Sequence, residues 1–350
     1  MRYIIYGAGS IGCLAGGLLA DSGKEVVLVA RPEQSEIINR NGIKIHSVVT
    51  QSRTVSKVTA VSSVKELKPR HNDILMLAVK SGQTALCCQE LREVYGYEAP
   101  LLCLQNGVRN EPTAAERFLH VYGVMLTACV NYLGPGEISH TLHKDLVLGN
   151  YPLGYDKVAS AIASDLRNAG FNVVLTPHIM AAKWAKLILN LSNSLLALTG
   201  HHLQLAWLHP EVSGLMADLQ DEGLSVLRAA RIDLLEGKNP IDVKGRIERA
   251  RKIASSPPDE DAIKTARDLP ELHRAYVSTF YDLKYRRGET EAGYLNGEII
   301  LLGQKHFIPT PINSLLFDLI ERSAAQHVQP GSYSVRQIRE LLSQPAPPES

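Results

Sequence analysis

A glycine-rich turn stands close to the start of the sequence. Gly7, Gly9 and Gly12 are spaced as G-x-G-x-x-G, directly after an apolar run and before a segment with helical composition. The first glycine of such a turn permits a tight bend, the second lets backbone N–H groups approach a pyrophosphate, and the third lets the helix pack closely on the sheet. Glycines can also merely close a turn, but this context favours a dinucleotide site that includes Ser10 and Ile11 at the positive end of the helix.

The end of the next predicted strand bears on which dinucleotide binds. An NAD site would place an acidic residue there to accept hydrogen bonds from the ribose 2′-hydroxyl, whereas this sequence has Arg31, with Glu33 close behind. A guanidinium suits a 2′-phosphate, either as a bidentate partner or stacked on adenine. We therefore expect NADPH as the cofactor. The alternative, that Arg31 is only a solvated surface charge, stays open.

Two later apolar runs end abruptly in polar residues. The run 73–79 leads into Lys80, and the run 101–104 leads into Gln105, Asn106 and Gly107. Ligands of open parallel sheets bind beyond the carboxyl ends of the strands. We therefore expect the ammonium of Lys80 and the amide of Asn106 near the cofactor and any anionic substrate, although each residue alone is also ordinary turn chemistry.

A long helix is predicted over Pro177–Thr199, after Thr176 as its N-cap. Most of it is apolar, yet Lys186, Asn190 and the pair Asn193/Ser194 recur at helical spacing and share one face. A polar face can simply be solvated. On a helix as apolar as this one, we expect it to face a cleft.

An acidic residue near the other end of the chain has a simple structural explanation. Thr290 or Glu289 can cap the helix predicted to follow, and Glu291 would then be an acid in its first turn. The helix dipole stabilises an acid at that position. No catalytic role is needed to account for it.

The elements that must position these residues fall into two groups. Before about residue 175, short β-branched runs alternate with helical segments, which is typical of a Rossmann-type, mostly parallel sheet. Beyond Thr176, apolar residues recur at helical spacing. We predict an α/β fold with an NADP-binding domain over 1–176, an all-helical domain over 177–343 and a flexible tail over 344–350. The predicted strands are Tyr3–Tyr6, Glu25–Ala30, Ile74–Val79, Leu101–Leu104, Val121–Cys129, Leu146–Leu148 and Asn172–Leu175.

Composition narrows the class of protein further. A chain of 350 residues, 45% hydrophobic and with a formal net charge of +1, predicts two globular domains and no nucleic-acid or membrane partner. No apolar stretch is long enough for a membrane span. The five cysteines form no C-x-x-C pair and are expected to be reduced thiols of a cytosolic protein. The 12 histidines give no metal-ligand pattern, so we expect no metal.

Taken together, these motifs resemble the ketopantoate reductase family (2-dehydropantoate 2-reductases), within the 6-phosphogluconate-dehydrogenase-like group. The resemblance covers residues 1 to about 330 and follows the family's order. It is carried by the turn at Gly7–Gly12, Arg31, Lys80, Leu104–Gly107, Gly134–Glu137, Trp184–Leu187 with Asn190, Thr290-Glu291 and Tyr294–Gly297.

The resemblance implies NADPH-dependent reduction of the C2 ketone of 2-dehydropantoate to pantoate. It implies that Lys186 is the general acid and Glu291 its acidic partner. An ammonium suits this role, because it can stabilise the negative charge that develops on the carbonyl oxygen and can donate the proton. The resemblance also places Lys80 along the cofactor crevice and makes Asn106 and Asn190 substrate ligands.

The resemblance assigns two further substrate-binding positions less directly. Ser194, with Asn193 beside it, stands where the family has a second asparagine, so this sequence departs from the pattern that reads the pantoate hydroxyls. The substrate-binding serine of the family falls at Ser278, or at Thr279 if a different neighbour is used as the anchor. We prefer Ser278.

Two other functions stay open. One is an NADPH-dependent reductase of another 2-oxo acid on the same scaffold, which the departure at Ser194 and the stretch 237–258 favour. The other is an NADPH-binding sensor without turnover, against which Lys186 and Glu291 argue. The sequence decides neither whether 237–258 forms a lid nor the oligomeric state, a homodimer included.

Overall fold

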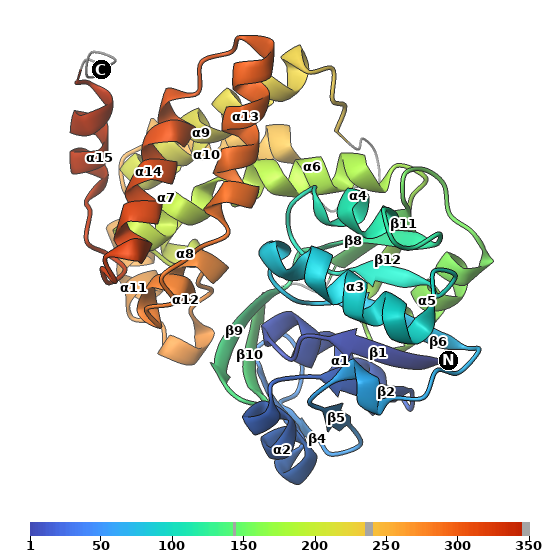
Figure 1. Ribbon diagram of the computed structural model, residues 1–350. Helices are drawn as coiled ribbons and strands as arrows, with labels where there is room; N and C mark the ends of the chain where they lie inside the picture. The colour runs from blue at the N-terminus through green and yellow to red at the C-terminus, as the bar shows by residue number, and fades with distance from the viewer. Residues whose placement is uncertain (143–144, 235–240, 345–350) are drawn as a thin grey trace. The chain divides into compact units, whose positions relative to one another are not determined.

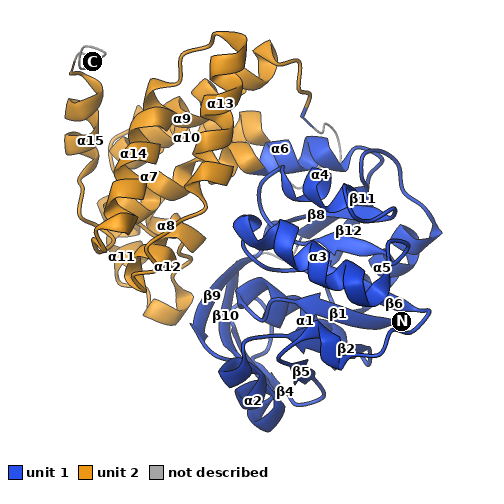
Figure 2. Ribbon diagram, viewed as in Figure 1, with its two compact units in different colours: residues 1–186, 234–241 blue, residues 187–233, 242–350 orange. Residues whose placement is uncertain are grey.

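The computed structural model describes residues 1–142, 145–234 and 241–344. It divides the chain into two compact units (Figure 2): unit 1 holds residues 1–186 and 234–241, and unit 2 holds residues 187–233 and 242–350. The sequence analysis placed this boundary after residue 176. The observed boundary lies later, within helix α6 (Ile179–Asn190), so the first part of that helix belongs to unit 1.

Unit 1 is built on an eight-stranded sheet of order β12-β11-β8-β7-β6-β1-β2-β5 (Figure 1). Within the described residues, β8 and β11 pair antiparallel and every other neighbouring pair is parallel. The predicted mostly parallel Rossmann-type sheet is therefore confirmed. Its strands are β1 (Arg2–Tyr6), β2 (Glu25–Val29), β5 (Thr59–Val61), β6 (Asp73–Leu77), β7 (Leu101–Cys103), β8 (Val121–Leu126), β11 (Asp145–Asn150) and β12 (Asn172–Leu175).

Helices cover both faces of this sheet. Alternate strand residues enter two apolar clusters, so that Tyr3 and Ile5 join one and Ile4 joins the other. Burial on both faces explains why these strands read as continuous apolar runs. The helices of unit 1 are α1 (Ser10–Asp21), α2 (Pro32–Asn41), η1 (Val64–Glu66), η2 (Ser81–Gln83), α3 (Thr84–Tyr95), α4 (Asn110–Ala115) and α5 (Lys157–Asn168).

A second, four-stranded sheet was missed by the sequence analysis. It has the order β4-β3-β10-β9 and consists of β3 (Ile43–Ser47), β4 (Arg53–Val55), β9 (Cys129–Gly134) and β10 (Glu137–Leu142). The predicted strand Val121–Cys129 is in fact the whole of β8 and the first residue of β9. Polar residues such as Asn131, Ser139 and His140 are buried in this sheet, so its strands lack the apolar runs on which the prediction relied.

Unit 2 contains only helices among its described residues, as predicted. The longest is α9 (Pro210–Ala229), which contacts α7, α10, α13, α14 and α15. The other helices are α7 (Ser192–Thr199), α8 (Leu203–Ala206), α10 (Val243–Ala254), α11 (Glu260–Arg267), η3 (Glu271–His273), α12 (Ser278–Lys284), η4 (Ala292–Tyr294), α13 (Asn296–His306), α14 (Pro311–Ala325) and α15 (Val335–Leu342).

The predicted continuous helix Pro177–Thr199 is two helices, α6 and α7, which meet at Leu191. The side-chain amide of Asn296 donates to the Leu191 carbonyl at 3.1 Å, and a side chain that enters the helical ladder is a recognised cause of such breaks. The predicted C-terminal end is confirmed, because Gly200 ends α7 in the left-handed conformation. The predicted start is two residues too early: α6 begins at Ile179 rather than Pro177, although the Thr176 hydroxyl does accept from the His178 N–H at 3.1 Å.

Three other predictions from the sequence can be compared with the structure. Of the stretch 237–258, Val243–Ala254 forms α10, which packs along α9, while 235–240 and residues 345–350 of the predicted tail lie outside the described residues. None of the described helices has the length and apolar character that a membrane crossing requires. All five cysteines are free, and burial raises the pKa of the Cys13 and Cys88 thiols to about 12.

We expect Asp73→Ala to lower the free energy of unfolding by roughly 3–5 kcal/mol, because it leaves a buried guanidinium without its partner. Asp73 joins β6 to β1 by accepting from Arg2 Nε at 2.8 Å and Arg2 Nη2 at 2.6 Å. The control is Glu25→Ala, which removes the exposed pair with Arg70 and should change stability by less than about 1 kcal/mol. Chemical denaturation measures both variants, and equal losses would contradict the expectation.

Candidate active site

The carboxyl ends of β2, β1, β6 and β7 lie side by side along one edge of the parallel sheet. The strand register aligns Val29, Tyr6 and Leu77 across the first three strands, and Leu77 with Cys103 across the last pair. Four of the predicted cofactor and substrate positions come within three residues of the ends of these strands. In strand order they are Arg31, Gly7, Lys80 and Asn106, so positions scattered over the first 106 residues form one row.

The glycine turn at this edge fits a dinucleotide. Gly7 has φ +108° and a Cβ there would lie 2.8 Å from the Ala78 carbonyl oxygen, while a Cβ on Gly12 would collide with the Gly7 carbonyl. Gly9 differs from both, because its φ of −74° suits any residue and a Cβ there meets nothing within 4 Å. The fold requires the first and third glycines, and the open space at the second, at the N-terminus of α1, suits a pyrophosphate.

Arg31 lies next to this turn. It is the exposed N-cap residue of α2, and Pro32 follows as the first helical residue. The Gln34 side chain donates to the Ala8 carbonyl, which ties α2 to the glycine turn. The guanidinium therefore leaves the chain at the end of β2, where the sequence analysis expected the residue that faces the ribose.

A buried hydrogen-bonded network holds the loop that carries Asn106. Gln105 Nε2 donates to the Thr84 hydroxyl at 2.7 Å, and that hydroxyl donates to Asn110 Oδ1 at 2.7 Å. Asn110 Nδ2 in turn donates to the Asn106 carbonyl at 2.7 Å and to the Ser81 hydroxyl at 3.3 Å. Every member except Asn106 is buried. The network therefore fixes the backbone of Asn106, whose residue stays partly exposed.

Helix α6 brings two lysines to the same unit. Lys186 is partly exposed, and its charge opposes the rise that burial causes in the pKa of Cys129, the first residue of β9. Lys183 is only 3% exposed, and its ammonium donates to the Gln105 carbonyl at 3.0 Å and to the Glu111 carboxylate. The sequence analysis missed Lys183 and Glu111, whose pairing is visible only once the chain is folded.

The predicted substrate residues Asn190 and Ser278 belong to unit 2. Asn190 is 6% exposed, and its amide nitrogen has no hydrogen-bond partner among the described residues. A buried donor without an acceptor is costly, so it points to a missing partner. Ser278 begins α12 and is exposed, whereas Thr279 is buried, which favours Ser278 as the residue that can meet a ligand.

Ser194 makes a hydrogen bond that the resemblance does not predict. It is 1% exposed, and its hydroxyl donates to Asn296 Oδ1 at 2.8 Å. Asn296 begins α13, so the hydrogen bond joins α7 to that helix inside unit 2. This contact gives Ser194 a packing role, and its assignment to the substrate stays a prediction.

The local structure around Glu291 corrects the sequence-based account of this residue. Glu291 precedes η4, a single 3₁₀ turn, and the α-helix that follows starts only at Asn296. Thr290, rather than Glu291, makes the local cap, by accepting from the Ala292 N–H at 3.0 Å. Glu291 is thus not in the first turn of an α-helix, and the helix-dipole explanation no longer accounts for it.

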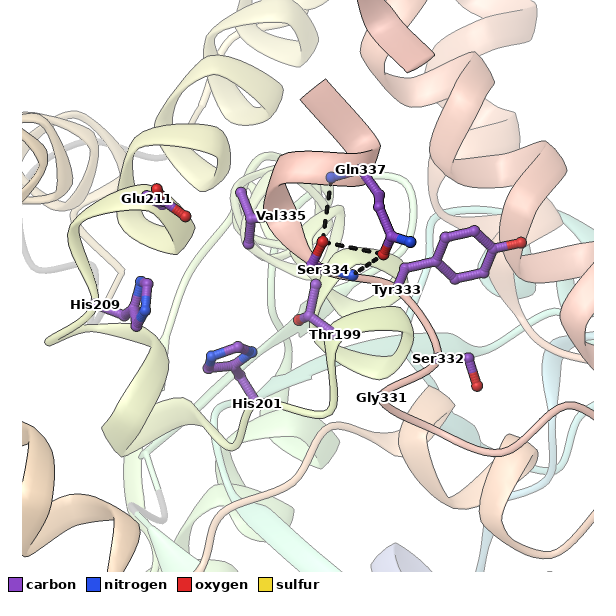
Figure 3. Close-up of a pocket in the computed structure, with 10 residues that line it drawn as sticks. All are labelled: Thr199, His201, His209, Glu211, Gly331, Ser332, Tyr333, Ser334, Val335 and Gln337. Atoms are coloured by element: carbon purple, nitrogen blue, oxygen red, sulfur yellow. Dashed lines mark hydrogen bonds between the residues drawn. The ribbon is translucent and has the colours of Figure 1, made fainter. Parts of the chain in front are cut away.

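Unit 2 also contains a separate hollow of about 460 Å³ (Figure 3). On one side, the rings of His201 and His209 meet edge to face, with centroids 5.5 Å apart, and burial lowers the pKa of His201. On the other side, Ser334 and Gln337 cap α15 through the hydrogen bonds drawn in Figure 3. None of the residues that the sequence analysis selected is among those described as lining this hollow.

The fold and site define a class of protein, an oxidoreductase that uses a nicotinamide cofactor and acts on a CH–OH/C=O pair. Comparisons specify the family. Residues 3–152 match the model "Ketopantoate reductase PanE/ApbA", and residues 178–324 match the model of its C-terminal domain. The chain belongs to the ketopantoate reductase family.

Individual relatives cover almost the whole chain. A 2-dehydropantoate 2-reductase of Pyrococcus horikoshii is 29% identical over 321 residues, which are 92% of this chain and 97% of that protein. The crystal structure of a PanE/ApbA family ketopantoate reductase from Ralstonia eutropha has a TM-score of 0.75 at 28% identity and covers 93% of this chain and 99% of its own. A D-mandelate dehydrogenase with NADH and anilino(oxo)acetate, at 22% identity and a TM-score of 0.74, shows the same fold over 93% of this chain and 99% of its own.

We expect Gly9→Ala to separate ligand binding from folding. Because a Cβ on Gly9 has open space around it, the melting temperature should stay unchanged. A methyl group where the pyrophosphate approaches should weaken NADPH binding at least about tenfold. The matched variant Gly12→Ala should instead lower stability by roughly 1–3 kcal/mol, because its Cβ collides with the Gly7 carbonyl. Thermal melting and NADPH titration measure both, and unchanged NADPH affinity in Gly9→Ala would refute the assignment.

Proposed function

We propose that the protein is an NADPH-dependent 2-dehydropantoate 2-reductase, which reduces the C2 ketone of 2-dehydropantoate to pantoate. The names of the relatives support the substrate. The observation that carries the proposal is the position of Lys186 on α6, in the unit that also contains the glycine turn and the Asn106 loop. An ammonium in this setting is the group that reduction of a ketone needs.

The residues at the edge of the sheet account for cofactor binding. Backbone N–H groups of the turn at Gly7–Gly12 and the α1 N-terminus bind the pyrophosphate, and Arg31 binds the 2′-phosphate. Lys80 and Asn106, which follow β6 and β7, line the part of the site that binds the nicotinamide. The bound cofactor supplies the hydride for the C2 carbon of the substrate.

The chain's own residues supply the acid and the substrate contacts. The Lys186 ammonium donates a hydrogen bond to the C2 oxygen, stabilises the negative charge there and passes on its proton. Glu291 orients this ammonium or accepts a hydrogen bond from a substrate hydroxyl. The unpartnered amide nitrogen of Asn190 donates to the substrate, and Asn106 and Ser278 complete its binding.

A second candidate function rests on Ser194. Because the Ser194 hydroxyl is bonded to Asn296, it does not replace the asparagine with which the family reads the substrate at this position. This favours a reductase of the same mechanism that acts on a 2-oxo acid with fewer hydroxyl groups. In either case the proposed reaction is the reduction of a 2-oxo acid. The two candidate functions differ only in the groups that the substrate carries beyond its C2 ketone.

We also propose that the reaction takes place in the cytosol. The support is the state of the cysteines, since all five are free thiols and four of them are buried. Burial raises the pKa of the Cys87 thiol to about 12, so it stays protonated and unreactive at neutral pH. Thiols of this kind are typical of a reducing compartment.

Lys186→Ala should lower kcat at least about a hundredfold, because general acid catalysis usually contributes roughly 10²–10⁴-fold. NADPH affinity should be nearly unchanged. The measurement is NADPH oxidation with 2-dehydropantoate, followed by absorbance and compared with Lys157→Ala, which removes an exposed lysine of α5.

The same assay with a panel of 2-oxo acids distinguishes the candidate functions. Turnover that is fastest with 2-dehydropantoate supports the first, and faster turnover with 2-oxoisovalerate or benzoylformate supports the second. Tight NADPH binding without oxidation across the panel would contradict both and leave a nucleotide sensor. A Lys186→Ala enzyme as fast as the unmodified one would remove this residue from the mechanism.

Arg31→Asp should shift cofactor preference from NADPH towards NADH by roughly 10- to 150-fold in the ratio of kcat/KM values. This range corresponds to one hydrogen bond between charged groups, about 1.5–3 kcal/mol. Arg40→Asp makes the same change of charge in the last turn of α2 and serves as the control. Equal use of both cofactors by the unmodified protein would show that Arg31 does not recognise the 2′-phosphate.

A further inference from the structure

A buried ion pair lies beside the proposed machinery without belonging to it. The Lys183 ammonium of α6 contacts the Glu111 carboxylate of α4, and the two side chains are 2% and 0% exposed. The ammonium also donates to the Gln105 carbonyl at 3.0 Å, immediately after β7. Three separate segments of unit 1 therefore meet at one ammonium group.

Stability alone does not explain this pair. Burying two charges costs free energy, and burial raises the pKa of Glu111 against the opposing effect of Lys183. One carboxylate oxygen, Glu111 Oε2, has no hydrogen-bond partner among the described residues. Replacing such a pair by apolar residues of similar size often leaves a protein equally stable. What an apolar pair cannot supply is a directional link between a helix and a particular backbone carbonyl.

The start of α6 is packed tightly where the pair forms. A Cβ on Gly123 of β8 would lie 2.8 Å from Ile179 Cγ1 and 3.2 Å from Glu111 Oε1, so the helix and the carboxylate both press on a glycine. This packing limits how far α6 can move away from the sheet. Apolar contacts constrain the rotation of α6 about its own axis only through the shape of the packed side chains, whereas the hydrogen bonds of Lys183 act in definite directions.

We propose that Lys183 is a positioning residue, which fixes the rotation of α6, and so the direction of Lys186, relative to the loop that carries Asn106. The inference rests on the proposed function, in which Lys186 and Asn106 meet the substrate. Lys183 and Lys186 are three residues apart, hence about 60° apart around the helix and about 4.5 Å along it. On the other side of the hydrogen bond, Gln105 directly precedes Asn106. The Lys183 ammonium thus links the helix that carries Lys186, the proposed acid, to the loop that carries Asn106, a proposed substrate ligand.

The hydrogen-bonded network around Gln105 holds in place the backbone carbonyl that accepts from Lys183. The Gln105 side chain is held by Thr84, and Asn110 holds the next carbonyl along the chain, so the acceptor of Lys183 lies between two fixed points. A rigid acceptor and a rigid carboxylate leave the ammonium one position. A displacement of about 1 Å in a reacting group can cost on the order of a hundredfold in rate.

The test is the double variant Lys183→Met/Glu111→Leu, which removes the pair without leaving an unpaired charge. We expect its melting temperature and NADPH affinity to stay close to those of the unmodified enzyme. The kcat with 2-dehydropantoate should fall about 10- to 100-fold, with a smaller change in KM, because the acid is present but misdirected. The pH profile of kcat should move as well, since the surroundings of Lys186 change.

The matched control is Arg2→Met/Asp73→Leu. It removes another buried ion pair of unit 1, at the starts of β1 and β6 and so at the opposite edge of the sheet. Its kcat and pH profile should be unchanged. A Lys183→Met/Glu111→Leu enzyme that folds and keeps both its kcat and its pH profile overturns the inference. If that variant does not fold, Lys183→Arg replaces it, because a guanidinium cannot reproduce both contacts of the ammonium; unchanged kinetics in Lys183→Arg overturn the inference equally.

A measurement that needs no turnover separates this inference from the proposed function. Reductive ¹³C-methylation labels lysine amines, and comparison with Lys186→Arg identifies the resonance of Lys186. Its titration midpoint should differ between the unmodified protein and the Lys183→Met/Glu111→Leu variant. An inactive unmodified protein with a shifted midpoint refutes the reductase proposal alone. An active protein whose Lys186 titrates identically in both refutes the positioning role alone.

Discussion

The parallel pairing of β2, β1, β6 and β7 is the constraint on which the candidate site depends. Each of these strands ends at the same edge, so residues separated by tens of positions in the chain meet there without any contact between their side chains being needed. The glycine turn is closely packed, because Gly7 lies against Ala78 at the end of the neighbouring strand. The arrangement of the candidate cofactor site thus follows from strand pairing.

Buried polar and charged groups also lie near the carboxyl ends of these strands, although burying such groups costs free energy. Thr84, Gln105 and Asn110 form hydrogen bonds among their side chains, and the Lys183–Glu111 pair buries full charges. Such groups are costly to bury, but they act in definite directions, which apolar packing does not. Beyond the carboxyl ends of β6 and β7 they hold loop backbones in place beside the proposed ligands.

The sequence predicted the main sheet, the glycine turn and the helical second unit because these follow local patterns. Continuous apolar runs mark strands buried on both faces, and glycine spacing marks the turn. The four-stranded sheet has neither signal, since it buries Asn131, Ser139 and His140. The Lys183–Glu111 pair joins residues 72 positions apart, which no periodicity reveals. The break at Leu191 was invisible for the same reason, because the side chain that bonds to the carbonyl there, Asn296, comes more than a hundred residues later.

The polar face that the sequence predicts on one helix is divided between α6 and α7. Lys186 and Asn190 lie on α6, whereas Ser194 lies beyond Leu191, on α7. Asn296 bonds to both Leu191 and Ser194 and reaches Asn313 at 3.0 Å, so the serine belongs to the polar cluster that interrupts the helix. A larger side chain at position 194 would meet this cluster. The serine at position 194 is therefore tied to helix packing within unit 2.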